Sequence, residues 1–212
     1  MSLFSDGIGS SRRGMCMSPT LRKRRLTMYL SEWRIPWSWD KNLYELHRIL
    51  WKAFPGRPAE QRSFVFRWER RQRALSVMML STVAPEMFQG MTCVRSSSFV
   101  PNLSQGTYGF ILRANPIKRL SKARNRVPLV GEEALKGWLL RKTENACQMK
   151  DIRIQGRDTV YFRKGAVPGK LVTVDYEGVF HLKDKAALLK LMTHGIGPAK
   201  AFGCGMFLIR RV

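Results

Sequence analysis

Residues 28–81 read MYLSEWRIPWSWDKNLYELHRILWKAFPGRPAEQRSFVFRWERRQRALSVMMLS, and this stretch decides the fold class because its hydrophobic period changes along the chain. Alternating apolar and polar side chains predict strands, whereas apolar side chains three or four residues apart predict a helix. Asp40 can cap that helix, and Pro55-Gly56 can end it. The mixture predicts an α+β fold. The expected elements are a strand at Tyr29–Ile35, a helix at Lys41–Phe54, and strands at Ser63–Trp68 and Leu75–Ser81.

The second half of the chain alternates in the same way, but less regularly. Glu132 and Glu133 suit the positive end of a helix. The overall order is compatible with two ferredoxin-like units, the class that includes the RNA-recognition motif. The expected elements are a strand at Thr107–Ala114, a helix at Glu132–Asn145, a β-hairpin at Leu171–Leu182 that turns near Glu177-Gly178, a helix at Lys185–His194 and a final strand at Met206–Arg210.

The charge of the chain is its most unusual property. Its 212 residues include 38 lysines and arginines against 15 aspartates and glutamates, a formal net charge of +23. Such an excess repels itself unless a polyanion binds, so nucleic acid is the expected partner. An anionic membrane is a weaker alternative, because the chain has no long segment with one basic and one aromatic face.

The cysteines and the apolar segments indicate where the protein works. No apolar run approaches the roughly 18 residues of a membrane span, and the N-terminus lacks the apolar core of a signal peptide. Scattered cysteines disfavour both a disulfide framework and a zinc knuckle. We therefore expect a cytoplasmic protein without a membrane partner, whose thiols are reduced: Cys16, Cys93, Cys147 and Cys204.

Residues 1–27 differ from the rest, because they are rich in Ser, Gly and Arg and have no hydrophobic period. We expect a flexible basic extension. Its Arg22–Arg25 run can add non-specific phosphate contacts. A poorly ordered tail without a dedicated function, with Met28 as an alternative start, is the other interpretation.

The helix expected at Lys41–Phe54 carries the most informative side chains. One helical stripe should face the core, formed by Leu43, Leu46, Leu50 and Phe54. Beside it lie a phenol, an imidazole and two cations at spacings that make neighbours on a helix, namely Tyr44, His47, Arg48 and Lys52.

These four side chains suit RNA cleavage without a metal. His47 titrates near neutral pH, so it can serve as acid or base towards a ribose 2′-hydroxyl. Arg48 and Lys52 should lower its pKa and stabilise a pentacoordinate phosphate. Tyr44 can orient the hydroxyl or share the proton transfer. A packed histidine beside two solvated cations is the competing interpretation.

A glycine-rich loop precedes the final strand, with the sequence GIGPAKAFGCG at residues 195–205. Its glycines let the backbone approach a ligand closely, and Lys200 adds a cation. The spacing is not that of a nucleotide-binding P-loop, so an RNA backbone is the favoured ligand. A turn used only for packing remains an alternative. The glycines concerned are Gly195, Gly197, Gly203 and Gly205.

From Met28 to Val212 the chain resembles the CasE-type CRISPR repeat endoribonucleases. The order and spacing of several stretches carry this resemblance, although no single motif decides it. The matching stretches are Met28–Ser31, the helix motif Tyr44-x-x-His47-Arg48-x-x-x-Lys52, the central signature Phe110–Arg119 followed by Arg126–Leu129, and the loop Gly195–Gly205.

The resemblance implies a fold and an activity. The fold would be two tandem ferredoxin-like domains, residues 28–115 and 116–212. The enzyme would bind a CRISPR repeat hairpin and cut the 3′ base of its stem by attack of the 2′-oxygen, leaving a 2′,3′-cyclic phosphate and a 5′-hydroxyl. It would need no metal or cofactor. It would keep the crRNA inside a Cascade-like complex, next to other subunits such as the backbone subunit.

The resemblance also assigns residues. Tyr44 and His47 match the catalytic pair, in an order of acid and base that the sequence leaves open, and Arg48 and Lys52 match supporting cations. A basic hairpin would bind the RNA stem together with the central signature and the loop. The expected RNA-binding residues are Arg113, Lys118, Arg119, Arg126, Arg163, Lys164, Lys170, Gly195, Gly197, Lys200, Gly203 and Gly205.

Two features depart from the family pattern, and two other functions compete. The extension at residues 1–27 is not part of the pattern, and the segment between Arg119 and Arg126 is short. The CRISPR subtype and the repeat sequence are not fixed by these residues. A non-catalytic subunit that grips the hairpin is the alternative within the family, and a small ribosome-associated protein would explain the charge equally well.

Overall fold

A computed structural model describes residues 26–37, 42–56, 62–119 and 126–212. Residues 1–25 of the expected extension lie outside this part of the chain, and so does Asp40. The helices are α1 (Leu43–Trp51), α2 (Glu132–Thr143) and α3 (Lys185–His194), with a short 3-10 turn η1 (Lys200–Phe202). In the described residues, none of the helices is long and apolar enough to cross a lipid bilayer.

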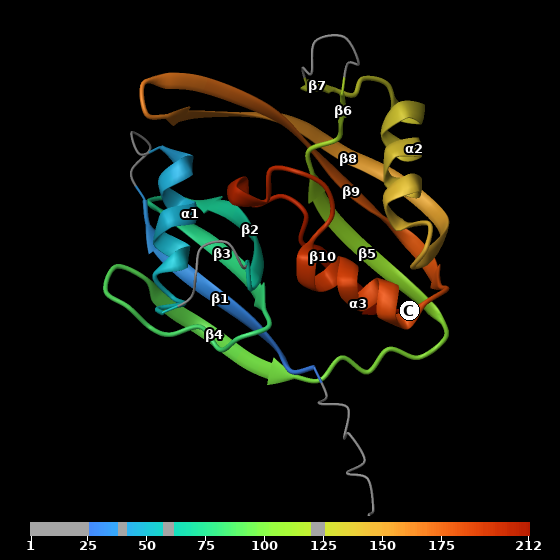
Figure 1. The fold of residues 1–212 in the computed structure, drawn as a ribbon, viewed down its shortest axis with the longest axis horizontal. Helices are drawn as coiled ribbons and strands as arrows, with labels where there is room; N and C mark the ends of the chain where they lie inside the picture. Colours follow the sequence, from blue (N-terminus) through green and yellow to red (C-terminus); the bar gives the residue numbers. More distant parts are fainter. Residues whose placement is uncertain (1–25, 38–41, 57–61, 120–125) are drawn as a thin grey trace, which may run out of the picture.

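The first half of the chain forms a four-stranded antiparallel sheet in the order β2-β3-β1-β4 (Figure 1). The expected strands in this half are confirmed, and β4 is an additional one. Its sequence, TCVRSSSF, is polar and almost wholly exposed, so it lacked the apolar alternation by which strands are found. The strands are β1 (Met28–Pro36), β2 (Phe64–Arg71), β3 (Ala74–Ser81) and β4 (Thr92–Phe99).

The second half forms another four-stranded antiparallel sheet, in the order β10-β5-β9-β8, and a small two-stranded ribbon of β6 and β7. The expected boundary at residue 115 would leave β5 with the first half, yet β5 pairs with β9 and β10. A division between β4 and β5 fits the two sheets better. The strands are β5 (Thr107–Ala114), β6 (Ile117–Arg119), β7 (Arg126–Pro128), β8 (Cys147–Lys164), β9 (Val167–Leu182) and β10 (Phe207–Arg211).

The expected hairpin within Leu171–Leu182 is wrong, because that segment is one uninterrupted strand. The chain turns instead at Gly165-Ala166, between β8 and β9. Gly178 is needed for a different reason: a β-bulge in β8 brings the carbonyl of Asp151 to within 2.0 Å of where a Cβ on residue 178 would lie. A glycine in a strand can mark such a close approach of backbones rather than a turn.

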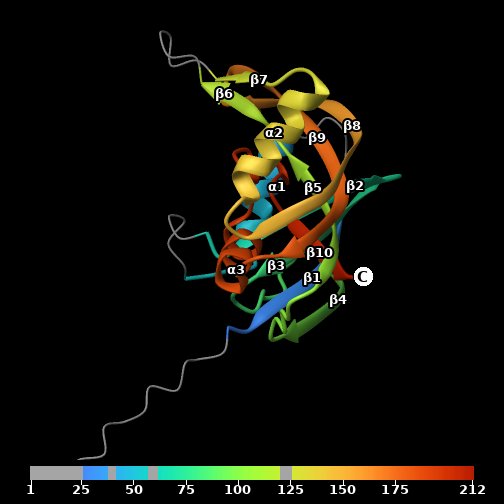
Figure 2. The same cartoon turned by 90° about the vertical axis from the view of Figure 1, so that its right-hand side faces the viewer.

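All three described helices cover the same side of the two sheets (Figure 2). The core below α1 is rich in aromatic side chains, and Leu46 and Leu50 of the helix enter it. The second core lies below α2 and α3 and also takes in Met28, Val65 and Leu80 from the first sheet. Apolar packing therefore joins the two halves of the protein, and the site lies where they meet.

Candidate active site between the two sheets

The helix α1 is held by its first residues and by one apolar face. Asn42 is its N-cap, and the Asn42 side-chain oxygen accepts a hydrogen bond of 3.1 Å from the backbone N–H of Tyr44. The helix is therefore shorter than expected. Because Leu46 and Leu50 are buried, Tyr44 and His47 come to lie half-buried on the flank. The spacing had predicted this arrangement, and it is confirmed.

His47 is held by two N–H donors at the same ring nitrogen. The indole Nε1 of Trp51 donates to His47 Nε2 at 2.9 Å, and Nη2 of Arg62 lies 2.9 Å from that atom. A nitrogen that accepts cannot carry the proton, so the neutral ring is protonated at Nδ1. Burial, and then the charge of Arg62, lower the pKa of His47 to about 4. The imidazole is therefore neutral at neutral pH.

The two cations expected to lower the pKa of His47 are not the ones that lower it. Arg48 and Lys52 are exposed on α1, and neither is a cause of the lowered pKa of His47. That expectation named the wrong residues. Arg62, which the sequence did not single out, takes this place from just before β2. One arginine among 38 basic residues gives no local signal, so only the fold could find it.

Arg62 and Lys200 are two partly buried cations close to α1. The guanidinium of Arg62 lies 5.8 Å from the ring centroid of Phe64. Burial lowers the pKa of Lys200, and the charges of Arg62 and Lys142 lower it further. Lys200, predicted as an RNA contact, lies in the 3-10 turn η1, whose Phe202 packs near Tyr44 of α1.

The glycine-rich loop packs tightly between the two sheets. A Cβ on Gly203 would lie 2.6 Å from the ring of Trp68 in β2, and one on Gly197 would lie 2.8 Å from the ring of Trp138 in α2. Packing therefore explains these glycines without a ligand, and the RNA contact stays a prediction. All four loop glycines have positive φ and leave less than 3.0 Å for a Cβ: Gly195, Gly197, Gly203 and Gly205.

The long β8–β9 hairpin reaches across to α1, as the orange ribbon in Figure 1 shows. Its basic residues were expected before and at the start of a strand, but Arg163 and Lys164 end β8 and Lys170 lies within β9. The ring centroid of Phe162 lies 4.3 Å from that of Phe202 in η1. The ring centroid of Phe202 lies 6.2 Å from that of Tyr44 in α1. The hairpin tip and α1 are therefore neighbours.

The basic residues of the central signature do not gather at α1. Arg113 forms a two-bond ion pair with Asp175, with both distances at 2.9 Å, and donates at 3.1 Å to the backbone oxygen of Trp68. It thus links the two sheets. The remaining three are exposed on the β6–β7 ribbon, away from α1 in Figure 1: Lys118, Arg119 and Arg126. Their RNA contacts stay predictions.

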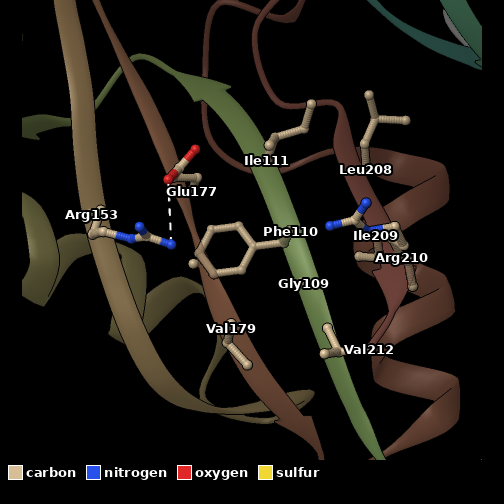
Figure 3. A pocket seen from close by; sticks show the side chains of 11 residues that line it. Gly109, Phe110, Ile111, Arg153, Glu177, Val179, Leu208, Ile209, Arg210 and Val212 are labelled. Carbon is tan, nitrogen blue, oxygen red and sulfur yellow. Dashed lines mark ion pairs between the residues drawn. The ribbon is translucent and has the colours of Figure 1, made fainter.

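A separate hollow of about 620 Å³ lies on the second sheet around Gly109 (Figure 3). Its lining combines apolar side chains such as Ile111 with the Arg153–Glu177 ion pair at 3.4 Å. It offers no histidine or tyrosine, and so no acid–base group like that at α1. In the described ranges, no group of three or more His, Cys, Asp or Glu side chains could hold a metal ion.

The whole chain from β1 onwards is similar to known CRISPR proteins. The profile of a family described as "CRISPR associated protein" matches residues 28–211. The chain is also 37% identical over 193 residues to the CRISPR system Cascade subunit CasE of Escherichia coli, covering 84% of this chain and 97% of that protein.

The chain belongs to the CRISPR associated protein family.

One further relative and two solved structures agree with that membership. CRISPR-associated endoribonuclease Cse3 of Thermus thermophilus is 28% identical over 192 residues, covering 79% of this chain and 90% of that protein. The crystal structure of Cas6e from E. coli superposes with a TM-score of 0.74 at 33% identity, covering 87% of this chain and all of that one. A structure of Cse3 bound to a 19-nucleotide RNA also gives 0.74, at 26% identity, covering 86% and 99% of the two chains. The expected membership of the CasE-type CRISPR endoribonucleases is confirmed.

Proposed function

We propose that this CasE-family protein binds the hairpin of a CRISPR repeat transcript and cuts it at the 3′ base of the stem without a metal. The observation that carries this proposal is His47, a neutral, half-buried imidazole with Tyr44 and Arg62 beside it. Acid–base groups and cations at one place are what cleavage by a 2′-hydroxyl requires.

In the proposed reaction the 2′-oxygen attacks the scissile phosphorus as its proton leaves. The bond from the 2′-oxygen to phosphorus forms, and the bond from phosphorus to the 5′-oxygen breaks. The products are a 2′,3′-cyclic phosphate and a 5′-hydroxyl. Because His47 is neutral at neutral pH, we assign it the role of base. Tyr44, whose ring centroid lies 6.5 Å from that of His47, orients the 2′-hydroxyl or returns a proton to the 5′-oxygen.

The β8–β9 hairpin is proposed to bind the RNA stem. Arg163 and Lys170 are exposed near its tip, and the tip lies beside α1. Cations there would contact stem phosphates and place the base of the stem over His47. A-form RNA is recognised largely through its backbone and shape, which suits such a contact. The RNA-bound relative supports this proposal.

The protein is also proposed to remain with its product in a Cascade-like complex. A relative named as a Cascade subunit supports this, at 37% identity. Contact with a backbone subunit is part of the proposal. A subunit that stays bound would turn over poorly, so a single turnover is the appropriate measure of its activity.

Both halves are proposed to be ferredoxin-like units. In each sheet the first and third strands lie in the centre and the fourth lies beside the first, as the orders β2-β3-β1-β4 and β10-β5-β9-β8 require. The second half has the full succession of β5, α2, β8, β9, α3 and β10. The first half lacks a described helix between β3 and β4.

The direct test is incubation of the purified protein with labelled repeat hairpins in EDTA, beside the His47→Ala variant. A single cut at the stem base by the wild type alone supports the proposal. Tight binding by both proteins without any cut would instead favour the non-catalytic hairpin-binding subunit.

A further inference from the structure

Arg62 has the contacts of a group that is ready to bind an anion. Its Nη2 lies 2.9 Å from His47 Nε2, while its Nη1 is buried and has no hydrogen-bond partner among the described residues. A buried N–H group without a partner is costly, because it has lost its water. No carboxylate of the described residues lies within ion-pair distance of Arg62.

Lys200 reaches the start of β2, next to Arg62, from the other half of the protein: a Cβ on Gly195 would touch both Val65 Cγ1 of β2, at 2.9 Å, and the end of the Lys200 side chain. Its aliphatic stem lies over two loop glycines: its Cε is 3.3 Å from where a Cβ on Gly195 would be, and its Cγ is 3.4 Å from where one on Gly205 would be. The glycines thus leave room for the lysine. Like Arg62, Lys200 has no carboxylate partner among the described residues, and Lys142 adds a third charge.

We propose that Arg62 and Lys200 form a two-cation site that binds the scissile phosphate beside His47. This inference rests on the proposed function and names two phosphate ligands that the helix motif does not contain. Arg48 and Lys52, the cations of that motif, are exposed on α1, whereas Arg62 and Lys200 are partly buried. A charged hydrogen bond is stronger where water is partly excluded.

A phosphate bound here completes the hydrogen bonding of Arg62. Nη1 is shielded from solvent in this conformation, so the guanidinium must turn for the phosphate to reach it. One phosphoryl oxygen can then accept from Nη1 and a second from Nη2, the paired geometry that guanidinium groups favour. Nη2 would then leave His47 Nε2, the atom that takes the proton. The indole N–H of Trp51, the other donor to Nε2, must also turn away before Nε2 can take the proton. The negative charge would also raise the pKa of His47 from its low value, which makes it a better base. Phosphate binding and base activation are one event in this arrangement.

The test measures binding and does not depend on catalysis. Two hairpins that end at the cleavage position are compared, one with a 3′-phosphate and one with a 3′-hydroxyl. Because charged contacts to a phosphate are strong, the wild type should bind the phosphorylated hairpin at least about tenfold more tightly, which corresponds to about 1.4 kcal/mol. In Arg62→Gln and in Lys200→Met this preference should fall to about twofold, while the affinity for the 3′-hydroxyl hairpin should change little.

Arg34→Gln is the matched control. Arg34 is exposed on β1, and it alternates with Trp33 and Ile35, which pack into the core under α1. It therefore lies on the opposite face of the first sheet. This variant should keep the full preference for the 3′-phosphate.

The outcomes separate this inference from the proposed function. A preference that persists in both Arg62→Gln and Lys200→Met overturns the two-cation site, even if the wild type cuts repeat RNA. A preference that is lost in both variants but kept in Arg34→Gln supports it. If the wild type also fails to cut, the phosphate site stands and the proposed function fails. Should Arg62→Gln not fold, as judged by thermal unfolding, Arg62→Lys and Lys200→Met decide the question, because Arg62→Lys keeps the charge and should retain part of the preference.

Discussion

The side-chain amide of Asn42 forms a pair of hydrogen bonds with the backbone of Arg163, which lies 121 residues further along the chain. Asn42 Oδ1 accepts from the Arg163 N–H at 3.0 Å, and Asn42 Nδ2 donates to the Arg163 carbonyl. The same Oδ1 caps α1 through the N–H of Tyr44. One side chain therefore joins the start of α1 to the tip of the β8–β9 hairpin.

Replacing Asn42 should separate its two contacts. Serine is a good N-cap but is too short to reach Arg163, so Asn42→Ser should keep the stability within about 0.5 kcal/mol. It should still weaken hairpin binding several-fold, because the β8–β9 tip is released. Asn42→Ala loses the cap as well and should cost about 1 kcal/mol. Thermal unfolding and hairpin titration measure the two effects. Unchanged affinity in both variants would show that the contact does not position the hairpin.

His47→Ala should lower the single-turnover cleavage rate at least about 100-fold, as expected for loss of a general acid or base. Affinity for an uncleavable hairpin with a 2′-deoxy residue at the cut should stay within about threefold, because a neutral side chain contributes little to phosphate binding. Loss of cleavage and affinity together would mean that His47 has a structural role.

The lowered pKa of His47 makes stability depend on pH. The unfolded chain binds a proton near pH 6.5 and the folded chain near 4, so the unfolded state holds more protons between these values. The contribution of His47 to the free energy of unfolding is complete above about pH 6.5 and is lost as the pH falls towards 4. The melting temperature of the wild type should therefore fall more steeply over this window than that of His47→Gln. Parallel curves would contradict the low pKa.

The ion pair of Arg113 and Asp175 lies within the second sheet, and it fixes the guanidinium that donates to the Trp68 carbonyl in β2 of the first sheet. The pair should therefore stabilise the contact between the two sheets. Asp175→Asn leaves a half-buried guanidinium without its charged partner and should cost about 2 kcal/mol. Arg153→Ala, which removes an exposed pair with Asp151 and Glu177, should cost less than about 1 kcal/mol. Denaturant titration compares them. Equal costs would mean that the Arg113 pair does not hold the sheets together.

Arg163 should contribute a stem phosphate contact through its side chain, since only its backbone is used by Asn42. Arg163→Ala should therefore weaken hairpin binding and reduce the slope of log affinity against log salt by about one. Arg34→Ala, on the opposite face of the first sheet, should leave the slope unchanged. An unchanged slope in Arg163→Ala would remove this residue from the RNA contacts.

The sequence by itself determined most helices and strands, and it determined which side chains lie on the flank of α1. The stripe of Leu46 and Leu50 fixes which way that helix faces, and this places Tyr44 and His47 together because they are spaced by one helical turn. The strands at Thr107–Ala114 and the helix at Lys185–His194 were likewise readable, because a local period reports which face is buried. The sequence motifs also indicated the family.

Only the tertiary structure decided which distant residues meet. Arg62, just before β2, contacts His47 of α1. Asn42 contacts Arg163 because the β8–β9 hairpin of the second sheet extends to the start of α1. Position 178, inside β9, requires glycine because a bulge in β8 brings the carbonyl of Asp151 against it. Such contacts depend on register and on the packing of separate elements, whereas a local sequence period records only which side of its own element is apolar.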